Sequence, residues 1–129
     1  MDKMCSEIQK ELNRIMPATV VVETTSVTRN ANTQRMLTMI LGVVYGWCLE
    51  HNADYVSYRP TQWRKLITKD KKPKKREELK KWSLQMCKDL YDLDLVNDNI
   101  SDAILIGCAY INQYIKTFDK YFEDKFNED

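Results

Sequence analysis

The stretch ATVVVETTS, residues 18–26, decides which fold the chain is expected to adopt. Three consecutive valines, Val20–Val22, predict a strand buried on both faces, because β-branched residues fit the pleated surface of a covered parallel sheet. The strand expected over 19–23 ends on a carboxylate, Glu23. A buried strand gains no stability from an acid at its end, so Glu23 indicates that a cation or hydrogen-bond donors lie beside it.

Helical and extended patterns alternate along the rest of the chain. A second short strand is expected over 54–58, after a long helix that runs from an N-cap at Asn32 or Thr33 to about Asn52. That helix is apolar nearly all round, which predicts burial on more than one side. Further helices are expected around Ile8, Leu12 and Ile15, over 61–67, along the stripe Leu79, Trp82, Met86 and Leu90, and from Asp98–Ser101 onward, with the aromatic tail 118–126 docking as a last turn or two.

The order of helix, strand, helix, strand and further helices indicates an α/β protein. Two short parallel strands, however, do not form a buried sheet that is stable by itself. We therefore expect either that the chain is a fragment or that further strands are supplied from elsewhere.

With 129 residues, 43% of them hydrophobic, the chain is long enough for a single domain, 1–129, with its own core. Its first residues show no signal-peptide pattern, and its longest apolar run, 36–49, is shorter than the roughly 20 residues that span a bilayer. The cysteines lie far apart within apolar segments and match neither a zinc site nor a disulfide framework. A cytoplasmic protein with reduced thiols and no membrane partner is expected; the cysteines are Cys5, Cys48, Cys87 and Cys108.

The net charge of +1 conceals a strong asymmetry along the chain. Residues 59–81 carry eleven Lys and Arg against three acids, whereas residues 82–129 carry four Lys against ten acids. A basic block in a near-neutral chain indicates a polyanion that binds at one place. For the segment 69–76 taken alone, a solvated flexible loop is an equally good interpretation.

Two glycines, Gly42 and Gly46, lie four residues apart near the centre of the long helix. This spacing places both on one helical face, where another backbone can approach closely. The face could pack on the sheet of the same chain or on a second copy. We favour a homodimer, because one other face is enough to cover the sheet.

A second group of polar residues opens the apolar helix near the end of the chain. Helix capping accounts for Asp98, Asn99 or Ser101, since their side chains can accept free backbone N–H groups. It accounts less well for Asp102, whose small apolar neighbours predict a buried position, where a carboxylate needs a cation or hydrogen-bond donors. Ligands collect at the carboxyl ends of strands in α/β sheets, where Glu23 lies. The two acids therefore suit Mg²⁺ or Mn²⁺, with ordinary ion pairs as the alternative for each.

Taken in order, three segments of the chain resemble the RuvC Holliday-junction resolvases. The family's strand-ending acid, its basic-Asn-Ala loop and its helix glycine are matched by ETTSVTRNANT, 23–33, and by Gly42. Its Pro-x-x-Trp-Lys segment is similar to RPTQWRK, 59–65, and its closing Asp-Ala helix motif is similar to SDAILIG, 101–107. The matches keep the family spacing over residues 5–115, which is nearly the whole chain.

The resemblance implies an RNase H-like fold of the RuvC type and a crossover junction endodeoxyribonuclease that cuts four-way DNA junctions with two Mg²⁺ or Mn²⁺ ions. It implies that Glu23 and Asp102 are catalytic metal ligands and that Asp98 or Asn99 is a further one. It also implies a homodimer that sets one site on each nicked strand. DNA phosphates would be held by basic and polar residues that carry position rather than sequence: Arg29, Asn30, Arg64, Lys65, Lys71, Lys72, Lys74, Lys75 and Arg76.

Three features depart from the family pattern. The opening strand with the first metal-binding aspartate has no counterpart, which predicts an N-terminally truncated domain that lacks one carboxylate. Asn99 stands where many members carry an acid, while Asp98 comes one residue too early, and Ser26 matches a position that is often aromatic. Two other hypotheses therefore stay open: a non-catalytic dimeric DNA-binding protein of the same fold, and an interaction protein whose lysine segment is only solvated. Bacterial and bacteriophage resolvases both fit the pattern.

Overall fold

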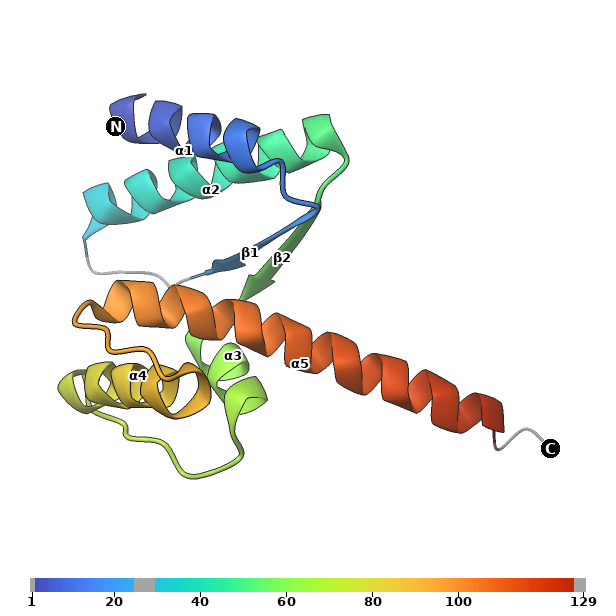
Figure 1. Ribbon diagram of the computed structural model, residues 1–129. Coiled ribbons are helices and arrows are strands. Elements are labelled where there is room, and N and C mark those ends of the chain that lie inside the picture. The colour runs from blue at the N-terminus through green and yellow to red at the C-terminus, as the bar shows by residue number, and fades with distance from the viewer. Residues whose placement is uncertain (1, 25–29, 127–129) are drawn as a thin grey trace. The chain divides into compact units, whose positions relative to one another are not determined.

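The computed structural model describes residues 2–24 and 30–126, and the chain divides into two compact units. The first unit spans Met1–Arg59 and the second spans Pro60–Asp129. The first contains α1 (Asp2–Ile15), β1 (Thr19–Glu23), α2 (Ala31–His51) and β2 (Asp54–Tyr58). The second contains α3 (Pro60–Ile67), α4 (Arg76–Tyr91) and α5 (Asp98–Phe126), as Figure 1 shows.

The sheet of the first unit consists of β1 and β2, paired in parallel from Thr19 opposite Asp54 to Glu23 opposite Tyr58. Both strands begin and end at the predicted residues, because their β-branched and aromatic residues favour extended backbone. Beyond the strand, the Thr24 backbone N–H donates to the Tyr58 carbonyl at 2.8 Å. The carboxyl ends of both strands therefore lie at one edge of the sheet, and Glu23 lies at that edge.

One face of α2 forms the core of the first unit with α1 and the sheet (Figure 1). Val44, Trp47 and Cys48 are buried there, and partly buried apolar residues pack on them: Ile8, Leu12, Val20, Val22, Ala53 and Tyr55. Other apolar residues of α2 are exposed, namely Met36, Met39, Tyr45 and Leu49. The expected burial of this helix on more than one side is therefore wrong for this chain alone, because its unit offers only α1 and a two-stranded sheet to pack on.

The N-terminus of α2 is capped by Asn30, two residues before the first predicted cap. Its side-chain Oδ1 accepts the backbone N–H groups of Asn32 at 3.0 Å and Thr33 at 3.3 Å. The predicted N-cap at Asn32 or Thr33 is therefore wrong. The physical reason is that an asparagine in extended conformation satisfies the free N–H groups two and three residues ahead of it.

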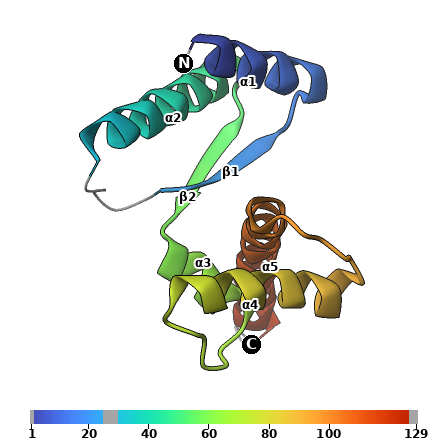
Figure 2. The same ribbon diagram turned by 90° about the vertical axis from the view of Figure 1, so that its left-hand side faces the viewer.

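The second unit is built around α5, which packs against both α3 and α4 (Figure 2). Trp63 of α3, Cys87 of α4, and Leu105 and Ala109 of α5 are fully buried. The Asn112 side-chain amide donates to the Leu66 carbonyl at 3.0 Å, which ties α5 to the end of α3. The start of α5, with Asp98 and Asp102, is thereby fixed relative to α3 and α4.

The buried face of α4 differs from the predicted stripe. Ser83 and Cys87 are buried, whereas Trp82 and Met86 are only partly buried and Leu90 is exposed. The packed face is thus turned by one residue from the apolar stripe. Small residues at 83 and 87 let α4 approach α5 closely, and the larger apolar side chains then flank the contact.

The C-terminal half of α5 is longer and more exposed than predicted. α5 continues without a break to Phe126, because nothing between Ser101 and Phe126 is a proline. Ile111, Tyr114 and Phe118 are at least half exposed. The predicted short docked tail is therefore wrong: its aromatic residues continue one long helix.

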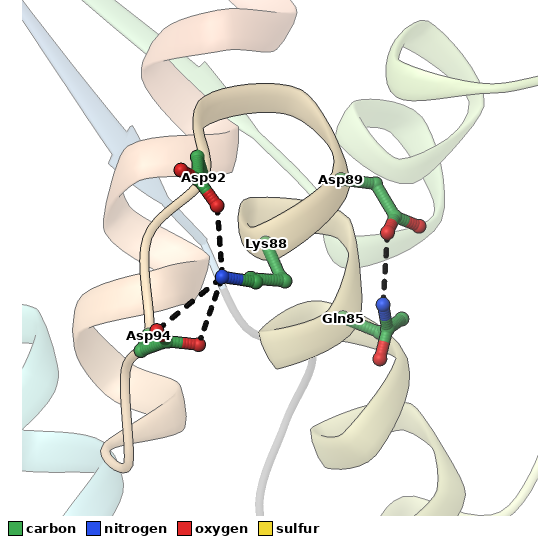
Figure 3. Close-up of polar contacts among 5 residues, drawn as sticks. All are labelled: Gln85, Lys88, Asp89, Asp92 and Asp94. Atoms are coloured by element: carbon green, nitrogen blue, oxygen red, sulfur yellow. Dashed lines mark hydrogen bonds and ion pairs between the residues drawn. The ribbon is translucent and has the colours of Figure 1, made fainter.

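A lysine on α4 organises the connection from α4 to α5. Lys88 Nζ lies 2.8 Å from Asp92 Oδ1 and 3.2 Å from Asp94 Oδ1, and Figure 3 shows it between the two carboxylates. Asp92 adopts the left-handed conformation that ends α4, with φ 55°. The ion pairs are exposed and add little stability, but they hold the connection that leads to the start of α5.

Candidate active site

Glu23 is the candidate site residue of the first unit. It is the last residue of β1 and is partly buried beside Tyr58 at the carboxyl edge of the sheet. This is the edge where parallel sheets gather ligands. The structure therefore places Glu23 at the end of β1, as the sequence predicts, while a role in catalysis stays a prediction.

Asp102 is the candidate site residue of the second unit, and it lies in the first turns of α5. It is partly buried, and the Ser83 hydroxyl donates to its Oδ1 at 2.5 Å. Burial raises the pKa of the Asp102 carboxyl above its ordinary value; the Ser83 hydrogen bond and the charge of Arg64 lower it, and nearby Asp98 raises it. Burial is the largest of these effects, so the pKa of Asp102 is raised overall.

A pair of buried serines supports Asp102, and the sequence reasoning did not identify it. Ser83 is 1% exposed and Ser101 is fully buried, with their hydroxyl oxygens 2.7 Å apart. The Ser101 hydroxyl also lies 3.0 Å from the Asp98 carbonyl oxygen, which it can donate to. The only sequence signal was a serine within the apolar pattern of α4, and helices tolerate serine in many positions without a ligand.

Asp98 and Asn99 form the first turn of α5 beside Asp102. Asp98 is partly buried and Asn99 is exposed. The capping expected from these side chains or from Ser101 is supplied instead by Asn97, whose Oδ1 accepts the Asn99 backbone N–H at 2.8 Å. Capping therefore does not use the Asp98 carboxylate, and its charge contributes to the field at Asp102.

The basic residues that were predicted to bind DNA lie mainly in the second unit. Lys71, Lys74, Lys75 and Arg76 are exposed in and after the α3–α4 loop, while Lys72 Nζ donates to the Asp70 carbonyl at 3.0 Å. Arg64 is partly buried over the Trp63 ring, with Cζ 5.2 Å from the ring centroid. Asn30 caps α2 in the first unit. Arg29 and Ser26 lie outside the residues that the structure describes.

One further lysine, Lys116, extends this basic surface onto α5. Lys65 lines a groove of about 280 Å³ between α3 and α5, together with Lys69 and Lys116. Sequence reasoning missed Lys116, because it is 40 residues or more from the basic segment and lies in an acidic part of the chain. Packing of α5 on α3 brings it to the same groove.

The glycine face of α2 is open. Gly42 and Gly46 are exposed, and a Cβ added at either position would meet no atom of the described residues within 4 Å. Packing of these glycines on the sheet of the same chain is therefore excluded for the described residues. The dimer contact stays a prediction.

The donor atoms present fit a hard cation in chemical type. Glu23, Asp98 and Asp102 offer carboxylate oxygens, which Mg²⁺ and Mn²⁺ prefer, and a positive ion would stabilise the charged form of Asp102, whose pKa burial raises. Within residues 2–24 and 30–126, however, no group of three His, Cys, Asp or Glu side chains gathers so as to hold a metal ion. The carboxylates of each unit therefore stay candidate ligands.

Among the described residues, no helix is both long enough and apolar enough to cross a membrane. No protein-family model matches the sequence. No curated protein sequence matches it either.

The two units carry a RuvC-like fold, which confirms the predicted α/β fold of the RuvC type. One solved structure that shows this is "T. thermophilus RuvC in complex with Holliday junction substrate". The match has a TM-score of 0.67 and 18% sequence identity, and it covers 89% of this chain and 67% of that one. At this identity the likeness shows the fold alone.

Proposed function

We propose that the chain is a metal-dependent endonuclease that hydrolyses phosphodiester bonds in four-way DNA junctions. The observation that carries this proposal is the Asp102 carboxylate, half-buried at the start of α5 and held by Ser83, on a fold shared with a resolvase solved with its junction. Perturbed acids of this kind gather at functional sites more often than elsewhere.

The proposed site uses a small set of carboxylates in defined places. Glu23 and Asp102 would bind Mg²⁺ or Mn²⁺, and Asp98 or Asn99 would add an oxygen from the first turn of α5. When bound, the ion supplies the Lewis-acid chemistry of phosphodiester hydrolysis. A cation beside Asp102 would replace the water that burial removes, and it would keep the carboxylate ionised.

The DNA backbone would be held by the basic residues of the second unit. Lys65, Arg64 and the segment 71–76 would bind phosphates, and Arg29 and Asn30 would do so from the loop before α2. A homodimer formed through Gly42 and Gly46 would present two sites to a junction with two strands to cut. We further propose that residues 1–129 act as one domain, and that the protein works in the cytoplasm, where its four free thiols stay reduced.

A cleavage assay tests the proposal. A labelled synthetic four-way junction is incubated with Mn²⁺ and the wild-type chain, Glu23→Gln, Asp102→Asn, or the control Asp119→Asn, which changes an exposed acid of α5. We expect paired nicks from wild type and control, and only the background rate from the other two variants, all of which should still bind the junction in EDTA. Equal cleavage by wild type and Asp102→Asn would contradict the proposal.

A second candidate function is a non-catalytic, dimeric DNA-binding protein. It is favoured by one observation: the described residues include no cluster of three metal-binding side chains. This candidate predicts tight junction binding without cleavage, and binding that is unaffected by Mn²⁺ or by Glu23→Gln. Weak, salt-insensitive binding would instead favour an interaction protein whose lysine segment is only solvated.

A further inference from the structure

The Ser83 hydroxyl is the direct hydrogen-bond partner of Asp102 within the second unit. Its Oγ lies 2.5 Å from Asp102 Oδ1, and it reaches α5 from α4, which is far away in the sequence. We propose that Ser83 is a positioning residue: it holds Oδ1 of Asp102 and thereby leaves the other carboxylate oxygen, Oδ2, as the one that would bind a metal ion. This inference rests on the proposed function, because it assigns Asp102 to a cation.

Burial makes the direction of this hydrogen bond definite. A buried hydroxyl is costly unless it is hydrogen-bonded, and Ser83 is 1% exposed. A serine hydroxyl has one proton to donate, and a carboxylate only accepts. The Ser83 proton therefore goes to Asp102, and the Ser83 oxygen remains free to accept from Ser101 at 2.7 Å.

The buried serine pair keeps Ser83 in place. Its partner Ser101, also fully buried, can donate either to Ser83 or to the Asp98 carbonyl oxygen. Cys87, one turn after Ser83, places its thiol 3.6 Å from the Ser101 carbonyl oxygen. Packing on all sides thus fixes the rotamer of Ser83, as a group that orients a metal ligand requires.

The arrangement leaves the two oxygens of Asp102 in different situations. Oδ1 receives the Ser83 proton, while no hydrogen bond to Oδ2 is found among the described residues of the second unit. Without Ser83 the carboxylate could rotate about its terminal torsion, which is broad for aspartate. Metal affinity would then fall, because the ligand would have to be ordered when the ion binds.

The alternative is that the Ser83 hydrogen bond only ties α4 to α5. A purely structural bond would affect stability and leave metal affinity unchanged in a folded variant. The two possibilities therefore differ in a binding measurement that needs no catalysis.

The experiment measures Mn²⁺ affinity of the full chain by calorimetry and by electron paramagnetic resonance of the free ion. We expect Ser83→Ala to weaken binding by about 10–100-fold, as is usual when a group that orients a ligand is removed. Asn112→Ala is the control, since it removes another hydrogen bond between two helices of the second unit that does not involve Asp102, and its affinity should stay close to wild type. If Ser83→Ala does not fold, Ser83→Cys keeps the volume with a weaker donor and should show an intermediate loss.

A double variant separates positioning from packing. In the Asp102→Asn background, Ser83→Ala should cause no further loss of Mn²⁺ affinity, because the ligand that it orients is already gone. Wild-type affinity in folded Ser83→Ala, or equal losses in Ser83→Ala and Asn112→Ala, would overturn the inference and leave the proposed function intact. A wild-type chain that binds no Mn²⁺ would overturn both the proposed function and this inference.

Discussion

The raised pKa of Asp102 makes one residue a source of pH dependence in the metal-free protein. An acid whose pKa is higher in the folded than in the unfolded state favours folding at low pH, and this contribution is lost as pH rises through the folded pKa. We therefore expect Asp102→Asn to raise the melting temperature of the EDTA-treated protein at pH 7.5. The gain should vanish below about pH 4, where aspartate is protonated even in the unfolded chain.

Thermal unfolding of both proteins in EDTA at several pH values checks this expectation. All other titrating groups are common to the two chains, so the difference between their melting temperatures isolates residue 102. An Asp102→Asn variant with the same gain at every pH would show that the amide acts through packing and not through charge. With excess Mn²⁺ only the wild type should be stabilised, because binding to the folded state raises its stability.

Met16 ends α1 in a conformation that suits glycine. Its φ is 50°, and its backbone N–H donates to the Leu12 carbonyl at 2.7 Å. A side chain in this left-handed region costs roughly 1–2 kcal/mol. Glycine avoids this cost, but its greater conformational freedom in the unfolded chain offsets part of the gain in stability. We expect Met16→Gly to stabilise the first unit by about 0.5–1 kcal/mol. Urea unfolding followed through amide signals of α1 checks this, with Met16→Ala, which keeps the Cβ, as the control that should show no gain.

Single residues also show where sequence reasoning works and where it stops. Glu23 could be placed from the sequence, because the valines before it leave no alternative to a strand that ends there. Ser83 could not, since its role depends on a contact between two helices that only packing creates. The cap at Asn30 was missed for a smaller reason: the asparagines at 30 and 32 are equally good caps by residue type, and the sequence does not indicate which of them precedes the helix.

Among the elements, the α3–α4 loop carries the exposed lysines that we expect to bind DNA. Charge reversal at Lys71, Lys74 and Lys75 should weaken junction binding. It should also reduce the slope of log affinity against log salt, by up to roughly 0.9 for each phosphate that the protein no longer neutralises. Lys72 belongs to the same predicted surface, but its ammonium already donates to Asp70, so its reversal should have a smaller effect.

Fluorescence anisotropy at several salt concentrations measures this slope. The matched control reverses three exposed lysines elsewhere, Lys3, Lys10 and Lys120, and changes the net charge equally. If both triple variants lower the slope by the same amount, net charge and not the loop governs binding. An unchanged slope for the loop variant would remove the loop from the DNA interface.

The helices and strands differ in how well their bounds and their packing can be predicted from the sequence. β1 and β2 follow from local pattern alone, because strand residues and their flanks are unambiguous there. The C-terminal half of α5 does not, since alternating aromatic and charged residues fit a docked tail as well as a long exposed helix. The predicted buried face of α4 was wrong for a related reason. The largest apolar residues of the helix predicted that face, but the close approach of α4 and α5 buries small residues instead, such as Ser83 and Cys87.

At the scale of the whole molecule, the open glycine face of α2 is the surface that we expect a second copy to cover. Gly46→Leu should leave the chain folded, because glycine in a helix interior costs about 0.5–1 kcal/mol relative to alanine, and an added Cβ meets no atom of the described residues within 4 Å. It should nevertheless dissociate the dimer by separating the two helices. Sedimentation equilibrium measures the outcome, and Gly107→Leu, at another helical glycine with open space, is the control that should remain dimeric.

A wild-type chain that sediments as a monomer at micromolar concentration would contradict this prediction.

The overall class of fold was predictable from the sequence, because acid, loop, glycine and Asp-Ala motif occur in an order that local packing could not produce by accident. The completeness of the candidate site was not predictable, because it depends on which carboxylates come together in space.

The two compact units follow one another in the chain at Arg59 and Pro60, and this division shapes how heat would inactivate the protein. A unit of about 60 residues buries a smaller share of its surface than a larger domain and is only marginally stable. The core of the first unit centres on three side chains of α2. Unfolding then need not be a single cooperative step, and one melting temperature would not describe it. Amide protons of the first unit should exchange sooner than those around Leu105. Because each unit holds one of the two candidate acids, the nuclease activity that we propose would end at the temperature that the weaker unit sets.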